Sequence, residues 1–163
     1  MGIPLNGTIS NFQQKLTTKG VKYNANLSKI FPVGCRAFDG TFAGHPAEIY
    51  VYYDEKTKNV YRAKAVYSAL SEDYCNRLYD ETKNSLTYKY SDAETESENV
   101  DGVSRPGFHI FTLDTNDNRY GEIDLYQSKD DVHLPYPDYY NLHIDYIDLQ
   151  NYFAHQDKVS DDL

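Results

Sequence analysis

The sequence predicts an α+β fold, an antiparallel sheet of about six to seven strands with two helices on one face, in the order α-β-β-β-α-β-β-β-β. Two observations support this prediction. Apolar residues recur at helical spacing in two segments, and each of these segments precedes a group of segments in which apolar and polar residues alternate. Because each helix precedes a group of strands rather than a single strand, the strands are expected to pair as antiparallel hairpins, which leaves one sheet face for solvent or a partner.

The first helix is expected over residues 8–19. The Thr8 hydroxyl can accept a hydrogen bond from a free N–H of the first turn, and Gly20 suits the left-handed position after a helix end. One apolar stripe follows helical spacing and consists of Ile9, Phe12 and Leu16.

Three strands are expected next, over residues 35–42, 48–53 and 60–67. The polar run 54–59 is predicted to connect the second and third strands as a hairpin. The second strand alternates, with Ile49, Val51 and Tyr53 on one face and Tyr50 and Tyr52 on the other.

A second helix is predicted over 71–84, because Ser71 is a good N-cap and acidic residues follow it at the positive helix end. A short strand is then expected at 86–90. The stretch 92–106 is acidic and almost without apolar residues, which predicts a mobile loop.

The clearest hairpin pairs residues 108–113 with 120–127, and a last strand is expected at 140–147. Residues 149–155 are expected to add one or two helical turns. The organisation predicted is a single α+β domain over residues 1–155, followed by a polar C-terminal tail at 156–163.

Charge and apolar runs exclude two classes of partner. The net charge is -9 and no cluster of Lys or Arg is present, so a nucleic-acid partner is not expected. The apolar runs are too short for membrane insertion or for a signal peptide. We expect a cytoplasmic protein if Met1 is the native start, and a periplasmic or cell-surface protein if a signal peptide was trimmed. The oligomeric state is left open.

The opening residues resemble a known group of proteins. Gly2-Ile3-Pro4, Gly7-Thr8, Phe12, Leu16 and Gly20 follow the pattern GIP-x-x-GT-x-x-x-F-x-x-x-L-x-x-x-G, and Phe42-Ala43-Gly44 and Ile144-Asp145-Tyr146-Ile147-Asp148 match later motifs. This pattern is similar to that of an uncharacterised family of small, often exported α+β proteins from gut-dwelling bacteria. The resemblance implies a fold and does not imply an activity.

No cofactor, metal site or catalytic residue is predicted. The five histidines show no metal-binding spacing, so a metal site would have to be assembled wholly by the fold. The two cysteines, Cys35 and Cys75, are expected either to be free or to form one disulfide. An alternative function is a hydrolase-like enzyme with a site around His143 and Asp145, which share the polar face of the last strand.

Tyrosine is the compositional outlier, with 17 tyrosines and no tryptophan. The leading hypothesis is a non-enzymatic binding domain that uses a tyrosine-rich sheet face and the loop 128–140 to bind a protein or a carbohydrate. The alternative is a structural or oligomerising module. The candidate binding residues are Tyr50, Tyr52, Tyr136, Tyr139 and Tyr140.

Overall fold

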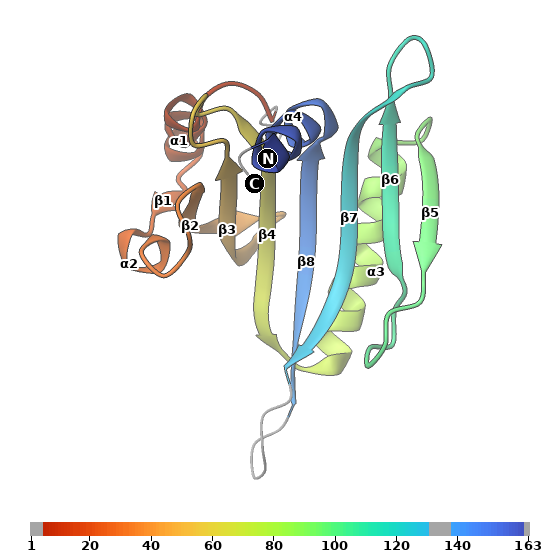
Figure 1. Ribbon diagram of the computed structural model, residues 1–163. Helices are drawn as coiled ribbons and strands as arrows, with labels where there is room; N and C mark the ends of the chain where they lie inside the picture. Colours follow the sequence, from red (N-terminus) through yellow and green to blue (C-terminus); the bar gives the residue numbers. More distant parts are fainter. Residues whose placement is uncertain (1–4, 131–137, 162–163) are drawn as a thin grey trace. The chain divides into compact units, whose positions relative to one another are not determined.

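The computed structural model describes residues 5–130 and 138–161, and it is an α+β protein with an open antiparallel sheet (Figure 1). The sheet has eight strands and the chain has four helices among these residues, so the prediction of six to seven strands and two helices is corrected. The hydrogen-bonded order of the strands is β1-β2-β3-β4-β8-β7-β6-β5.

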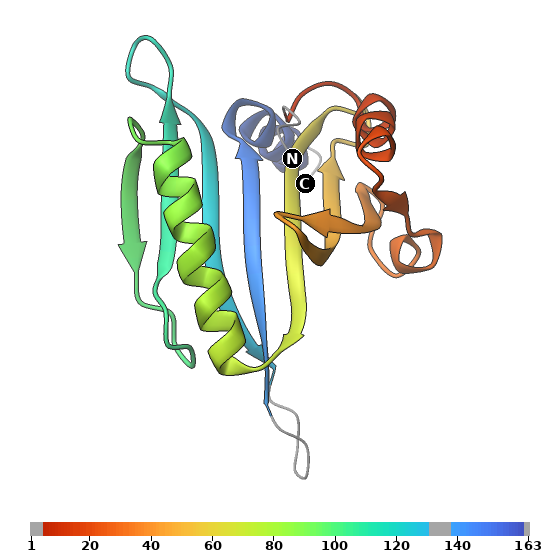
Figure 2. The ribbon, with the colours of Figure 1, turned by 180° about the vertical axis from the view of Figure 1, so that it is seen from behind.

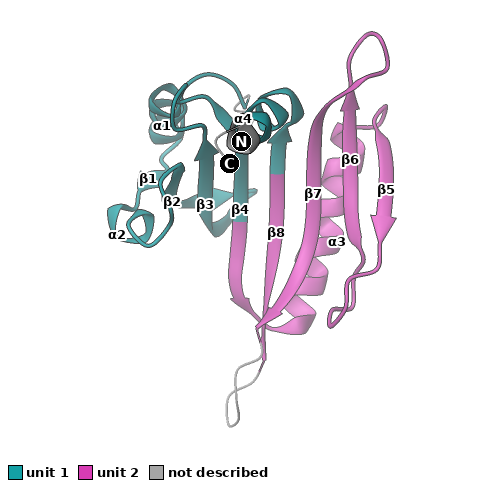
Figure 3. Cartoon of the chain, viewed as in Figure 1, with its two compact units in different colours: residues 1–65, 146–163 teal, residues 66–145 magenta. Residues whose placement is uncertain are grey.

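The chain forms two compact units (Figure 3). Unit 1 comprises residues 1–65 and 146–163, and unit 2 comprises residues 66–145. The chain passes between the units within two strands, β4 (Val60–Leu70) and β8 (Tyr139–Asp148). Each unit is described below by itself.

Unit 1 begins with helix α1 (Ile9–Thr18), as predicted, and Thr8 caps it by accepting a hydrogen bond from the Asn11 amide at 3.5 Å. The three predicted strands are present as β2 (Cys35–Phe42), β3 (His45–Tyr53) and the start of β4. The apolar stripe of α1 packs against β2 and β3, and its core residues are Ile9, Phe12, Leu16, Val21, Phe38, Ile49, Val51, Tyr53 and Val60.

Three further elements of unit 1 complete the description. Strand β1 (Lys22–Tyr23) and helix α2 (Ala25–Ser28) lie between α1 and β2, where no element was predicted. Helix α4 (Leu149–Asp161) includes the predicted helical turns and continues into the segment predicted as a polar tail. The side chain of His155 in α4 contacts Asp54 at 3.1 Å and stacks on Tyr61.

Unit 2 is built on helix α3 (Glu72–Lys89), which lies across β6 (Gly107–Leu113) and β7 (Arg119–Asp130) (Figure 2). The short strand predicted at 86–90 is wrong, because α3 runs through it. Leu86 is in phase with the buried face of the helix, which contains Cys75, Leu78, Tyr79, Thr82 and Leu86.

The stretch 92–106 is not wholly a loop, which corrects a second prediction. It contains strand β5 (Glu94–Glu98), which is exposed at all five positions and pairs antiparallel with β6. Arg119 on β7 forms ion pairs with two glutamates of β5, Glu94 at 2.9 Å and Glu96 at 2.7 Å, and these contacts stabilise the position of β5.

The predicted β6–β7 hairpin is confirmed, with Phe108 paired to Leu125 and Ile110 to Ile123. Its turn is closed by the Asp114 carboxylate, which accepts hydrogen bonds from the backbone amides of residues 116 and 118. β7 continues to Asp130, and the segment 131–137, with most of the predicted loop, lies outside the described residues. Among the described helices, none has the length and apolar character needed to span a membrane.

Candidate functional site

The two faces of the β5–β8 strands in unit 2 differ in chemistry. Ile110 and Leu125 are fully buried on the face covered by α3, where Lys83 of the helix lies over the ring of Phe108. Because side chains alternate along a strand, the residues between these apolar positions point to the opposite face. We call this opposite side of β5–β8 the open face. Most of its side chains are polar, although Phe111 also lies there and stacks on His109. Its polar and tyrosine side chains include Glu98, His109, Glu122, Asp124, Tyr126, Ser128 and His143.

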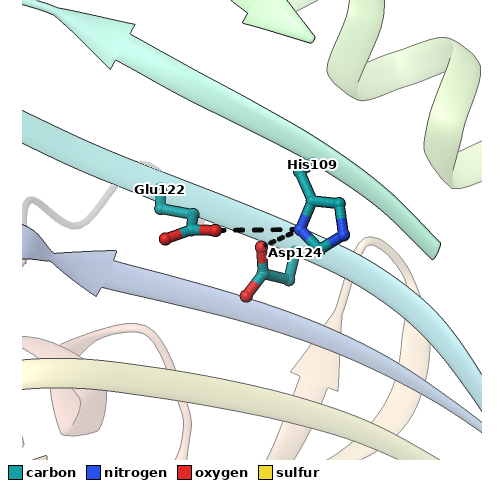
Figure 4. A group of neighbouring side chains, drawn as sticks. All are labelled: His109, Glu122 and Asp124. Atoms are coloured by element: carbon teal, nitrogen blue, oxygen red, sulfur yellow. Dashed lines mark hydrogen bonds and ion pairs between the residues drawn. The ribbon is translucent and has the colours of Figure 1, made fainter. Parts of the chain in front are cut away.

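Three side chains of the open face form one cluster (Figure 4). Nδ1 of His109 lies 2.7 Å from Oδ1 of Asp124 and 3.7 Å from Oε1 of Glu122. One ligating atom from each of the three residues lies within 4.8 Å of the other two, and all three side chains are half-buried. Among the side chains that the structure describes, those of residues 5–130 and 138–157, this is the one group of three or more His, Cys, Asp or Glu residues arranged in this way.

The strand register explains why these residues meet. His109 on β6 is the direct cross-strand partner of Asp124 on β7, and Phe111 is the partner of Glu122. Asp124 and Glu122 are two residues apart on one strand, so both carboxylates project from the same face as His109. The β6–β7 register is irregular between Thr112 and Leu113, next to the turn, and it is regular at the cluster.

The electrostatics of the cluster follow from the two neighbouring carboxylates. Burial and the adjacent charge of Asp124 raise the pKa of Glu122 to about 7. Burial lowers the pKa of His109, but the hydrogen bond to Asp124 and the charges of Asp124, Glu98 and Glu122 outweigh it, so the net shift of this pKa is upward. Both upward shifts favour a positive charge between the carboxylates, which a proton on His109 or a bound cation could supply.

A second group on the open face contains His143, which the sequence analysis named as part of an alternative enzyme site. Nε2 of His143 lies 2.7 Å from the hydroxyl oxygen of Ser128, and the ring stacks on Tyr126 at 4.6 Å. Asp145 is buried, with 1% of its surface exposed. Ser128 was not among the predicted site residues, because its partnership with His143 depends on the pairing of β7 with β8.

Of the five candidate tyrosines, two lie in unit 1 and two in unit 2. Tyr50 and Tyr52 are half-buried on β3 in unit 1, and the Tyr50 hydroxyl donates a hydrogen bond to Glu48 at 2.6 Å. In unit 2, Tyr140 is 9% exposed and Tyr139 is 36% exposed. Tyr136 lies outside the described residues.

The two thiols are poorly suited to act as nucleophiles at neutral pH. Cys35 and Cys75 are free and buried, which decides between the two expectations for them. Burial raises the pKa of each thiol to about 11. Both therefore remain protonated at neutral pH.

Sequence reasoning did not find the His109 cluster, although a signal for it was present. In the predicted hairpin, His109, Glu122 and Asp124 are the polar residues that alternate with apolar ones on facing strands. One His nitrogen and two carboxylate oxygens at this separation can bind a divalent cation. A comparison with known protein families, curated proteins and solved structures finds no match. The resemblance of the opening residues to a bacterial family stays a prediction.

Proposed function

We propose that the protein is a binding domain whose ligand is a divalent metal ion held on the open face by His109, Glu122 and Asp124. The observation that carries the proposal is the convergence of three ligating atoms, one from each residue, within 4.8 Å. The proposal keeps the predicted class, a non-enzymatic binding domain, and assigns the ligand to the histidine and carboxylates rather than to the tyrosines.

The distances in the cluster support this proposal. Ligand bonds of about 2.0–2.2 Å in a tetrahedral site separate the ligand atoms from one another by about 3.3–3.6 Å. The separations from Nδ1 of His109 to Asp124 and Glu122 are 2.7 Å and 3.7 Å, on either side of that range. Small side-chain rotations would therefore be enough to admit an ion.

The local charge supports the proposal as well. Glu122 and Asp124 are half-buried side by side on one strand, with 23% and 17% of their side chains exposed. Burial, together with the like charges that ionising both carboxylates places side by side, raises the pKa of Glu122, and a bound divalent cation would reduce that repulsion. The three proposed ligands come from two strands of one hydrogen-bonded hairpin, and ligands on paired strands lose less conformational freedom on binding than ligands on loops.

Isothermal titration calorimetry with Zn²⁺, Ca²⁺ and Mg²⁺ tests the proposed function. We expect about one ion per chain for the wild type, and loss of that binding in the double variant Glu122→Gln and Asp124→Asn. Glu81→Gln is the matched control, because Glu81 is an exposed acid on α3. Absence of binding of Zn²⁺, Ca²⁺ and Mg²⁺ alike to the wild type, or equal binding by the double variant, refutes the proposal.

A second candidate function is a hydrolase-like activity at Ser128 and His143. It is favoured by the 2.7 Å contact between the serine oxygen and Nε2, a geometry in which imidazole can accept the hydroxyl proton. A fluorophosphonate probe followed by peptide mass spectrometry tests it. We expect labelling of Ser128 that disappears in His143→Ala, and an unlabelled Ser128 in the wild type would exclude this candidate.

A further inference from the structure

His109 is flanked by carboxylates on both of its ring nitrogens. While Nδ1 faces Asp124 and Glu122, Nε2 lies 3.5 Å from Oε1 of Glu98 on β5. We infer that Glu98 is a positioning residue, which orients His109 so that Nδ1 is the metal ligand. We infer also that the site binds a zinc-like transition-metal ion rather than Ca²⁺ or Mg²⁺. Both statements rest on the proposed function.

The backbone leaves room for Glu98 to reach the histidine. Glu98 pairs with Gly107 in the β5–β6 ladder, and His109 lies two residues further along β6 on the same face. A Cβ atom placed on Gly107 would lie 3.2 Å from Cγ of Glu98 and 3.6 Å from its Oε1. The glycine therefore provides the space through which the Glu98 side chain passes to Nε2.

A carboxylate beside Nε2 influences which nitrogen of the His109 ring can bind a metal. A neutral imidazole carries one N–H and one lone pair, and the partner of the N–H decides which nitrogen is left to bind a metal. In the imidazolium form both nitrogens carry a proton. When an ion displaces the proton between Nδ1 and Asp124, which is released to solvent, the other proton stays on Nε2 and can be donated in a hydrogen bond to the Glu98 carboxylate. Carboxylates in this position orient ligating histidines and increase their basicity.

The donor set defines the class of ion. Imidazole nitrogen is a good ligand for Zn²⁺ and its neighbours in the transition series. Ca²⁺ takes six to eight oxygen ligands and Mg²⁺ prefers an octahedral shell of oxygens, whereas His109 places a nitrogen at the centre of this cluster. An ion bound with Nδ1 as a ligand is therefore expected to be one that tolerates mixed nitrogen and oxygen coordination.

Calorimetric titrations with Zn²⁺, Ca²⁺ and Mg²⁺ test the inference, together with ¹⁵N NMR of the His109 ring. We expect Zn²⁺ to bind the wild type and shift Nδ1, and Glu98→Ala to weaken binding by about 10- to 100-fold. Glu98→Gln should restore most of the affinity, because its amide oxygen still accepts the N–H. Gly107→Ala should weaken binding by displacing Glu98.

Glu94→Ala is the matched control, because it removes the same charge from the same strand and its partner is Arg119. It should leave the affinity within about twofold. If Zn²⁺ binds the wild type and is lost in the Glu122 and Asp124 double variant, but Glu98→Ala binds as tightly as the wild type, the proposed function stands and the inference fails. Ligation through Nε2, or comparable affinity for Ca²⁺, would also overturn it. If no ion binds, both fail together.

Discussion

Replacing Asp54 with alanine should destabilise unit 1 by about 3–4 kcal/mol. The buried Oδ1 of Asp54 accepts hydrogen bonds from the Lys56 amide, the Thr57 amide and the Thr57 hydroxyl at 3.1, 2.7 and 2.9 Å. At about 1 kcal/mol for each, these bonds contribute about 3 kcal/mol. The contact between Oδ2 and Nδ1 of His155 at 3.1 Å is partly exposed and adds at most about 1 kcal/mol.

The assay is urea denaturation followed by far-ultraviolet circular dichroism. Asp54→Asn can keep the Oδ1 acceptor, but it removes the charge and replaces the Oδ2 that faces His155 with an NH₂ group, so it should cost about 1 kcal/mol. Glu55→Ala, at an exposed neighbouring acid, should change stability by less than about 0.5 kcal/mol. The reasoning is refuted if Asp54→Ala stays within about 1 kcal/mol of the wild type, or if Asp54→Asn costs as much as the alanine variant.

Three further predictions concern the hydrophobic core, the stability of the protein at low pH and the reactivity of its two thiols. Leu125→Ala should cost about 2–5 kcal/mol in the same urea titration, because Leu125 is fully buried under α3. The hydrogen bond from Arg105 lowers the pKa of Asp80. The pair therefore stabilises the fold fully at a pH above about 3.9, the ordinary pKa of an aspartate. This contribution is lost as the pH falls through the lowered pKa. Both side chains are at least 35% exposed, so the effect should be below about 1 kcal/mol, and Arg105→Gln should abolish it in stability measurements between pH 2 and about 5. Because burial raises the pKa of Cys35 and Cys75, iodoacetamide at about pH 8 should label them slowly in the native protein and rapidly in urea, and rapid native labelling would contradict their burial.

The parts of the fold that the sequence predicted are those with strong local signals. Thr8 and Ser71 cap helices as expected, and the β6–β7 hairpin pairs as its alternation predicted. The errors come from segments where local pattern and tertiary packing disagree. Residues 86–90 alternate like a strand, but Leu86 completes the buried face of α3 and the helix continues. β5 contains no apolar residue and is held by pairing with β6 and by Arg119.

The candidate site required information that a local pattern does not carry. His109 and Asp124 are 15 residues apart, and their contact depends on the register set by the intervening turn. Glu98 reaches His109 only because β5 pairs with β6. Ser128 meets His143 in the same way, across two strands joined by a connection for which no pairing was predicted. The sequence identified the polar face of the last strand, with His143, but it placed Glu98 and Ser128 in loops, and in each case the partner was decided by strand pairing.

Strand β5 ends the hydrogen-bonded order of the sheet, and its composition has a consequence for association. Three of its five residues are glutamates, and all five side chains are exposed. If β5 of a second copy paired with this strand, its glutamates would lie against the glutamates of an edge that carries the same charge. Such repulsion is how sheet proteins keep an open edge from recruiting further strands. We therefore expect this edge to act as a gatekeeper against fibrous aggregation at neutral pH.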